Sequence, residues 1–243
     1  MNIRDEHLLR ELNLYPLWVR RGAPVAEAVA PAPAPAAPVV ETPAAPAPIA
    51  DTVPRTAQIE PAADWGTLKR QVRDCTACKL RAGCTQTVFG VGDQSADWLF
   101  VGEGPGADED AQGEPFVGQA GKLLDNMLLS IGLKRGHKVY IANVVKCRPP
   151  NNRTPEPDEI ATCLPYLYRQ IALIQPKLVV ALGKTAATAL LGREAPLGSL
   201  RGTLHDFHGT PLIVTYHPAY LLRSPAEKAK AWQDLCFALQ QMK

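Results

Sequence analysis

Four of the six cysteines have the spacing expected of metal ligands. Two form a CxxC pair and two follow later, with fifteen residues between them; the four are Cys75, Cys78, Cys147 and Cys163. Four thiolates suit zinc or an iron–sulfur cluster, and the ligand set alone favours neither. Cys84 is a rival ligand because it lies close to the CxxC pair, whereas Cys236 is expected to be a buried thiol on an apolar helix face.

A carboxylate, an amide and an imidazole stand at or just after apolar runs of strand length. Glu103 follows residues 97–101, Asn143 lies within the run 138–145, and His217 follows residues 211–216. Such groups transfer protons, stabilise charge and read a polar ligand through hydrogen bonds. The structural alternatives are a turn-capping asparagine and a strand-end histidine.

The glycine-rich segment Gly102-Glu-Gly-Pro-Gly106 follows the first of these runs. A dinucleotide fingerprint would need G-x-G-x-x-G opening a helix and an acidic residue at the end of the next strand. Here Pro105 interrupts the segment, and the next run reaches Asn143 instead of an acid. A dinucleotide site is therefore weakly supported.

The elements that must position these residues alternate between strand and helix from residue 97 onward. The expected strands are residues 97–101, 138–145, 177–182 and 211–216, and the expected helices are residues 119–133, 156–174, 184–191 and 226–242. This alternation predicts an α/β fold of three layers, α/β/α, with a central, mostly parallel four-stranded sheet. Ligands bind beyond the carboxyl ends of such strands. One site is therefore expected from the loops 102–118, 143–155, 183–185 and 217–224.

The chain divides into three parts. Residues 1–22 carry leucines at helical spacing, then aromatic and basic residues, and form either a dispensable tail or a peptide that docks on a protein partner. Residues 23–63 are rich in proline and alanine, so we expect a disordered tether that reaches on the order of 100 Å at about 3.1 Å per residue. Residues 64–243 are the expected folded, catalytic domain.

Composition limits the function classes. The net charge of +2 gives no global field for nucleic acid, so any DNA-binding surface must be a local patch. The sequence contains neither a run of about 18 apolar residues nor a secretory signal at its start. Six cysteines in such a chain indicate metal ligands or buried thiols before disulfides, and we expect a cytoplasmic protein.

Several motifs together resemble the family 4 uracil-DNA glycosylases. The first is Gly102-Glu-Gly-Pro-Gly-Ala-Asp-Glu-Asp110 with Gly113-Glu-Pro-Phe-Val-Gly118 and Ala120-Gly-Lys-Leu-Leu124. The others are Ala142-Asn-Val-Val-Lys-Cys-Arg-Pro-Pro150 and His217-Pro-Ala219. The resemblance covers residues 75 to about 240 in order. It implies a uracil-DNA glycosylase-like fold, uracil-containing DNA as substrate, and a [4Fe–4S] cluster on the four cysteines in place of zinc.

The resemblance also implies roles in the pocket for a flipped uracil. Glu103 would activate water and stabilise the sugar cation, and His217 would donate to the charge that develops on uracil O2. Phe116 would stack on the base, and Asn143 would read its N3–H and O4. The remaining substrate-binding residues are Gly104 in the glycine-rich loop and Glu109, which would reject the 5-methyl group of thymine.

DNA phosphates and the base gap need further contacts. The start of the helix 184–191 offers Lys184 and Thr185 to a phosphate. Leu222 and Arg223 follow His217 and are suited to open the base stack and hold the backbone. We expect a monomer.

Two other functions remain open at this stage. One is a non-catalytic iron–sulfur nucleic-acid-binding module, and the other is a glycosylase for another deaminated base. A zinc-stabilised nucleotide hydrolase is a weaker alternative, because no cluster of carboxylates and histidines suited to a catalytic metal is visible.

Overall fold

Short apolar strands build a mixed sheet in the computed structural model, which describes residues 64–242. The strands are β1 (Val91–Gly92), β2 (Trp98–Gly102), β3 (Val139–Asn143), β4 (Leu178–Leu182), β5 (Leu204–Phe207) and β6 (Thr210–Thr215). Their order is β1-β3-β2-β4-β6-β5. The four inner strands are parallel and confirm the predicted sheet, while β1 and β5 add antiparallel edges that extend it to six strands.

Burial on both faces explains why the inner strands are nearly continuous apolar runs. Every residue of β2, β3 and β4 is buried. Parallel strands covered on both sides require this composition, since neither face meets water. The edge strands differ: β1 has two residues and β5 alternates in exposure, so neither produces a strong sequence signal.

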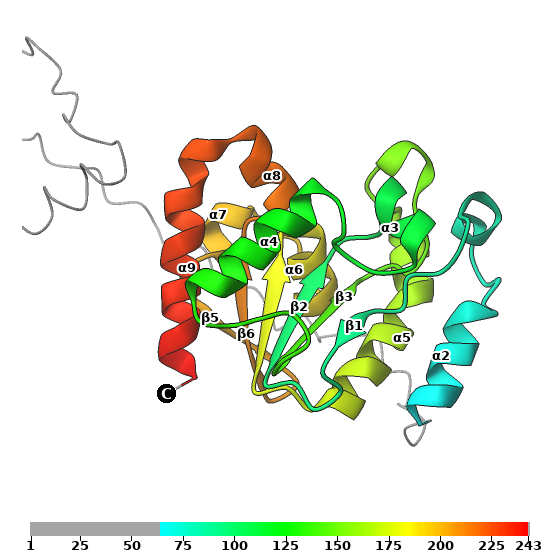
Figure 1. Cartoon of the computed structure of the whole chain (residues 1–243), viewed down its shortest axis with the longest axis horizontal. Helices are drawn as coiled ribbons and strands as arrows, with labels where there is room; N and C mark the ends of the chain where they lie inside the picture. Colours follow the sequence, from blue (N-terminus) through cyan, green and yellow to red (C-terminus); the bar gives the residue numbers. More distant parts are fainter. Residues whose placement is uncertain (1–63, 243) are drawn as a thin grey trace, which may run out of the picture. The chain divides into compact units, whose positions relative to one another are not determined.

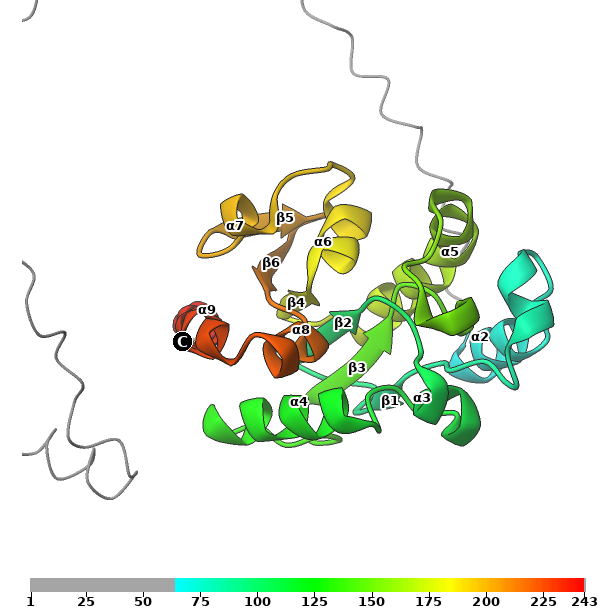
Figure 2. The same ribbon diagram turned by 90° about the horizontal axis from the view of Figure 1, so that it is seen from above.

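Helices cover both faces of the sheet (Figures 1 and 2). On one face pack α5 (Pro157–Ile174) and α6 (Lys184–Leu191), and on the other α4 (Gln119–Ser130) and α9 (Lys228–Gln241). These four correspond to the predicted helices, with bounds that differ by up to three residues. The domain is therefore the predicted three-layer α/β/α arrangement.

The remaining helices lie around this three-layer core. They are α2 (Trp65–Arg73), η1 (Lys79–Gly83), α3 (Ala107–Gln112), η2 (Pro150–Asn152), α7 (Leu197–Leu200), α8 (Pro218–Arg223) and η3 (Pro225–Glu227). Helix α2 packs against α5 outside the sheet, and its Leu68 and Val72 bury themselves with Phe89. Two segments predicted as loops, 102–118 and 217–224, thus contain α3 and α8.

Two further findings bear on the expectations from sequence. The predicted docking peptide 1–22 and tether 23–63 lie outside the described residues. Within residues 64–242, the helices are all too short or too polar to cross a membrane.

Candidate active site

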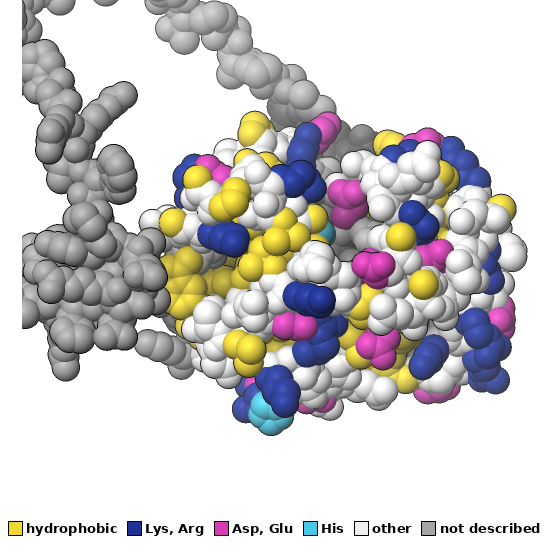
Figure 3. All heavy atoms as spheres, turned by 45° about the horizontal axis from the view of Figure 1, so that its top comes forward, with side chains coloured by type: hydrophobic (Ala, Val, Ile, Leu, Met, Phe, Trp, Pro, Cys, Tyr) yellow, Lys and Arg dark blue, Asp and Glu magenta, His cyan; other side chains and the backbone are white. Residues whose placement is uncertain are grey.

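A cavity of about 470 Å³ opens at the carboxyl ends of β2 and β3, beside the start of α8. Figure 3 turns this end of the sheet toward the viewer and shows a hollow with acidic, histidine and hydrophobic side chains at its edge. The lining includes all six predicted pocket residues, Glu103, Gly104, Glu109, Phe116, Asn143 and His217. A cavity of this size is in the range that holds a small ligand.

Asn143 is the last residue of β3 and faces the cavity from its floor. The residue is 2% exposed, and its Oδ1 has no hydrogen-bond partner among the described residues. It pairs in register with Gly102 of β2, and a Cβ on Gly102 would lie 2.5 Å from Asn143 Oδ1 and 2.5 Å from the Phe116 ring. Glycine at 102 therefore leaves the amide and the aromatic ring space to occupy the same corner.

Phe116 lies in a strained turn that Arg135 holds through backbone hydrogen bonds. Its φ of 56° lies in the left-handed region, which is costly for a bulky residue. Arg135 donates to the carbonyl oxygens of Pro115 and Phe116 at 2.9 and 2.8 Å, and also to Asp125. Gly121 permits the turn, since a Cβ there would lie 1.8 Å from the Phe116 carbonyl oxygen. The ring is thus fixed against the cavity by several groups.

His217 enters the cavity as a neutral hydrogen-bond donor. Its ring stacks on Phe116 with centroids 5.4 Å apart. Burial, followed by the charge of Arg223, lowers the pKa of His217 to about 4. The Ala219 amide donates to Nδ1 at 3.1 Å, so the proton of the neutral ring resides on Nε2. The geometry leaves Nε2–H to donate to a ligand.

Glu103 follows β2 directly and is held by a neighbouring helix. Thr185 Oγ1 donates to Glu103 Oε2 at 2.5 Å, and the Val145 amide donates to the Glu103 carbonyl at 3.1 Å. The hydroxyl fixes one carboxylate oxygen and leaves the other to accept a proton or face a cation. Thr185, predicted as a phosphate contact, is therefore engaged with Glu103, the residue predicted to activate water.

Glu109 lies in α3 and caps several backbone groups. Its Oε2 accepts from the Gly106 amide at 3.0 Å, and its Oε1 accepts from the Val117 and Gly118 amides at 3.0 and 3.1 Å. These bonds tie the glycine-rich loop to the Phe116 turn. Glu109 is thus a rigid part of the cavity wall.

Only one of the predicted DNA contacts lines the cavity. Arg223 lines the cavity, whereas Lys184 and Leu222 do not. Lys184 pairs with Glu194 at 2.8 Å on the surface, and Leu222 is 43% exposed beside the mouth on α8. An exposed leucine next to a polar cavity is compatible with insertion into a base stack.

The four predicted ligand cysteines line one cavity between η1, the segment after β3, and α5. The Lys146 amide donates to Cys163 Sγ at 3.2 Å. No three His, Cys, Asp or Glu side chains in residues 64–242 are drawn together as a ready-made metal site. Burial raises the pKa of the Cys147 and Cys163 thiols, so they would ionise only with a cation beside them. The four cysteines line the same cavity, and thiolates are the donors that a metal cluster takes.

Cys84 and Cys236 stand outside this lining. Cys84 lies next to Cys147, and Arg81 binds its carbonyl at 3.4 Å and its sulfur at 3.6 Å. Cys236 lies on α9 and is half-buried.

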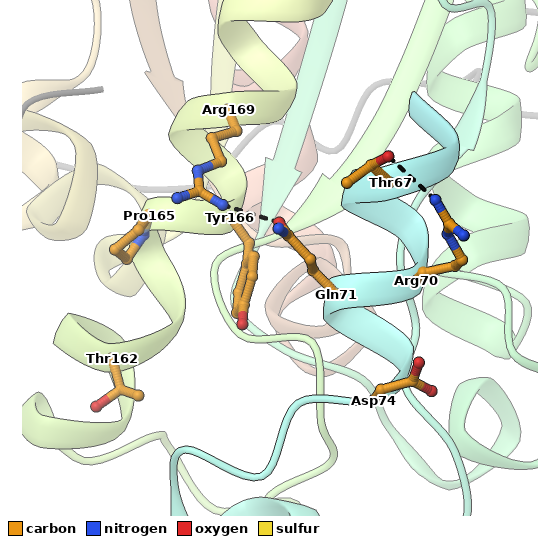
Figure 4. Close-up of a pocket in the computed structure, with 8 residues that line it drawn as sticks. All are labelled: Thr67, Arg70, Gln71, Asp74, Thr162, Pro165, Tyr166 and Arg169. Atoms are coloured by element: carbon orange, nitrogen blue, oxygen red, sulfur yellow. Dashed lines mark hydrogen bonds between the residues drawn. The ribbon is translucent and has the colours of Figure 1, made fainter. Parts of the chain in front are cut away.

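A groove between α2 and α5 adjoins the cysteine cavity (Figure 4). Arg169 of α5 donates to Gln71 of α2 at 2.9 Å across it. Tyr166 and Thr162 line both the groove and the cysteine cavity. Helix α2 is therefore the outer cover of the cysteine region.

Sequence reasoning missed the groups that support the site. Arg135, Lys146 and Arg153 are not among the site residues predicted from the sequence. Arg153 in fact binds Glu159 through two hydrogen bonds of 2.8 and 2.7 Å. The Arg135 and Lys146–Gln170 contacts join residues about 20 apart in sequence and form only in the folded domain, whereas the start of α5 brings Arg153 and Glu159 together locally.

Comparison with known proteins agrees with this geometry. The profile of the family described as "Uracil DNA glycosylase superfamily" matches residues 89–236, which include the whole cavity lining. This match covers more than half of the chain and places it in the uracil-DNA glycosylase superfamily.

Individual relatives narrow the assignment. A type-4 uracil-DNA glycosylase of Thermotoga maritima is 46% identical over 67% of this chain and 85% of the relative. A type-4 enzyme of Pyrobaculum aerophilum is 43% identical over 71% of this chain and 91% of the relative. A type-5 uracil-DNA glycosylase of Thermus thermophilus is 32% identical over 54% and 68%. The chain belongs to the type-4 uracil-DNA glycosylase family.

Proposed function

We propose that the protein removes uracil from DNA by hydrolysing the N-glycosidic bond, the first step of base-excision repair. The observation that carries the proposal is the buried Oδ1 of Asn143 at the floor of the cavity, which has no hydrogen-bond partner within residues 64–242. A buried polar atom without a partner is costly, so it points to a ligand that supplies one.

Uracil has the matching hydrogen-bond groups. Asn143 Oδ1 accepts from uracil N3–H, and the Asn143 amide donates to O4. Cytosine presents an acceptor and an amine there, so both groups of the asparagine would remain unpaired. A site of this kind discriminates by about 10⁴-fold or more. The base reaches the site by flipping out of the stack onto Phe116.

Bond cleavage creates a negative charge on the leaving uracil and a positive charge on the sugar, and the site has a group for each. The electron pair of the C1′–N1 bond moves to uracil, and the sugar becomes an oxocarbenium ion. His217 Nε2–H donates to O2 of the leaving uracil anion. Glu103, oriented by Thr185, stabilises the cation and accepts the proton of the water that adds to C1′.

Glu109 serves selectivity against thymine in this proposal. Its carboxylate is fixed by three backbone amides and cannot swing aside. A rigid wall at the 5-position of the base would reject a methyl group.

Cys75, Cys78, Cys147 and Cys163 would hold a [4Fe–4S] cluster, which joins the segment before η1, the end of β3 and helix α5 into one unit when bound. A reducing, cytoplasmic setting suits these unpaired thiols. We propose a monomer that acts on uracil-containing DNA through Lys184, Leu222 and Arg223.

The test is alkaline strand cleavage of a labelled oligonucleotide with a single uracil, beside matched oligonucleotides with cytosine or thymine. We expect cleavage at uracil alone, lost in Asn143→Ala. Asn126→Ala, an exposed asparagine on α4, is the matched control and should keep full activity. Cleavage at another deaminated base only, or none from a cluster-loaded protein, would overturn the proposal.

The cluster has its own test. Iron–sulfur protein absorbs near 400 nm, and zinc protein does not. Cys147→Ser should lose this absorbance, and Cys84→Ser and Cys236→Ser should keep it. Loss in Cys84→Ser with retention in Cys78→Ser would replace one ligand by the other.

A further inference from the structure

Lys146 carries a buried cation between the base-reading cavity and the cysteine cavity. The residue is 1% exposed and stands immediately before the ligand Cys147. Its Nζ donates to the Asn143 carbonyl oxygen at 2.8 Å and to Gln170 Oε1 at 2.6 Å. Both acceptors are neutral, and no carboxylate within residues 64–242 forms an ion pair with this ammonium.

Such a group is unfavourable for folding taken alone. Removing an ammonium from water is costly, and neutral oxygens compensate less than a carboxylate does. An apolar side chain of similar length would fill the space without this penalty. The position of the ammonium therefore calls for an explanation other than stability.

The partners of Lys146 form a continuous network. Gln170 is fully buried in α5, and its amide donates to the Phe89 carbonyl at 2.9 Å. The Lys146 backbone amide donates to Cys163 Sγ, and its carbonyl accepts from the Val88 amide at 2.7 Å. One residue thus joins the end of β3 to α5, to the strand-edge segment 88–89 and to a cluster ligand.

We propose that Lys146, anchored by Gln170, is a positioning residue that fixes the Asn143 peptide and thereby aims the Asn143 side chain at uracil. This inference rests on the proposed role of Asn143 as the reader. Asn143 is the last residue of β3, and the peptide that follows it is held on two sides: the Val144 amide donates to the Gly102 carbonyl at 3.0 Å, and Lys146 Nζ donates to the Asn143 carbonyl. The side-chain oxygen has no hydrogen-bond partner within residues 64–242, so the orientation of this peptide sets the direction in which the side chain points.

The experiment measures Lys146→Met in the wild-type and Asn143→Ala backgrounds, with full-length, cluster-loaded protein. The readouts are the single-turnover excision rate on a uracil oligonucleotide, the affinity for the same duplex without uracil, and the absorbance near 400 nm per protein. In the wild-type background we expect the rate to fall on the order of 10- to 100-fold, since a misplaced group costs about that much. Duplex affinity and absorbance should stay unchanged.

The decisive result is the absence of any further fall when Lys146→Met is added to Asn143→Ala. A residue with only a structural role would lower the rate equally in both backgrounds, and that result, or a wild-type rate in Lys146→Met, overturns the proposal. Lys177→Met, which removes an exposed lysine paired with Asp97, is the control and should change nothing.

A second variant covers misfolding. Gln170→Met removes the anchor and keeps the bond from Lys146 to Asn143, so we expect a smaller fall that also vanishes in Asn143→Ala. If Asn143→Ala itself excises uracil at the wild-type rate, the proposed reader is wrong and the inference ends with it. If Asn143→Ala is impaired and Lys146→Met lowers the excision rate equally in both backgrounds, only the positioning role of Lys146 is overturned.

Discussion

Asn143 and His217 face the same cavity with opposite hydrogen-bonding character. Asn143 presents a free acceptor, and His217 presents a donor because the Ala219 amide already occupies its Nδ1. Sequence placed both residues at one sheet edge, since both stand at the ends of apolar runs. The tautomer of His217 could not be predicted, because it depends on α8 starting at Pro218, which brings the Ala219 amide to Nδ1.

The neutral state of His217 makes folding stability depend on pH. The unfolded chain has a histidine pKa of 6.5, and the folded protein has a value of about 4. Below pH 6.5 the unfolded chain takes up a proton that the folded protein refuses, so stability is lost as pH falls from 6.5 toward 4. The loss between pH 7 and pH 5 amounts to about 2 kcal/mol.

Between pH 7 and pH 5 the free energy of unfolding should therefore fall less in His217→Gln than in the wild type. We expect the two losses to differ by about 2 kcal/mol. Urea unfolding at the two pH values measures this. His137→Gln, an exposed histidine, is the control and should keep the wild-type difference. Identical pH dependence in wild type and His217→Gln would show that the folded ring titrates normally.

At the scale of elements, the predicted and observed structures agree where the signal is continuous and differ where it is short. Residues 98–101 and 178–182 are unbroken apolar runs, and they lie in central strands. Helix α8 has six residues and begins with Pro218, so it offers too few positions for a helical period to be recognised. The two-residue β1 exists only because β3 provides its partner.

Helix α5 begins with an ion pair whose consequences can be measured. Arg153 lies just before the helix and makes two hydrogen bonds to Glu159, whose side chain is fully buried. Glu159 also accepts from the Glu156 amide at 2.7 Å. The Arg153 guanidinium holds the pKa of Glu159 down to about 2, against an ordinary value of 4.5. This pair fixes the segment between the active-site loop and Cys163.

Glu159→Gln should lower the free energy of unfolding at pH 7 by on the order of 2 kcal/mol, since a charge-assisted hydrogen bond is replaced by neutral ones. A carboxylate with a lowered pKa stabilises the fold above its unfolded pKa, and that contribution is lost as pH falls through 4.5 toward 2. The wild type and the variant should therefore converge between pH 5 and pH 3. Asp158→Asn, exposed on the same turn, is the control, and an equal effect of both changes would contradict the ion-pair account.

At the scale of the whole molecule, the charge and the family match both place the function in the folded domain. The net charge of +2 gives no general attraction for DNA, and the cations among the residues that line the cavity are Arg153 and Arg223. The superfamily match ends at residue 236 and begins at residue 89, within the folded domain. About two thirds of this chain aligns with the type-4 relatives. The aligned part covers 85% of the Thermotoga maritima protein and 91% of the Pyrobaculum aerophilum protein.

The residues before position 64 are therefore expected to be dispensable for the chemistry. Every residue that lines the active-site cavity or the cysteine cavity lies between residues 72 and 223. A chain that starts at residue 64 should keep the excision rate, the absorbance near 400 nm and the thermal midpoint of the full-length protein. Single-turnover kinetics and thermal unfolding of the two proteins, side by side, make the comparison. A slower rate at unchanged thermal midpoint would assign residues 1–63 a part in substrate handling, whereas a pull-down of a protein by residues 1–22 alone would support their predicted docking role.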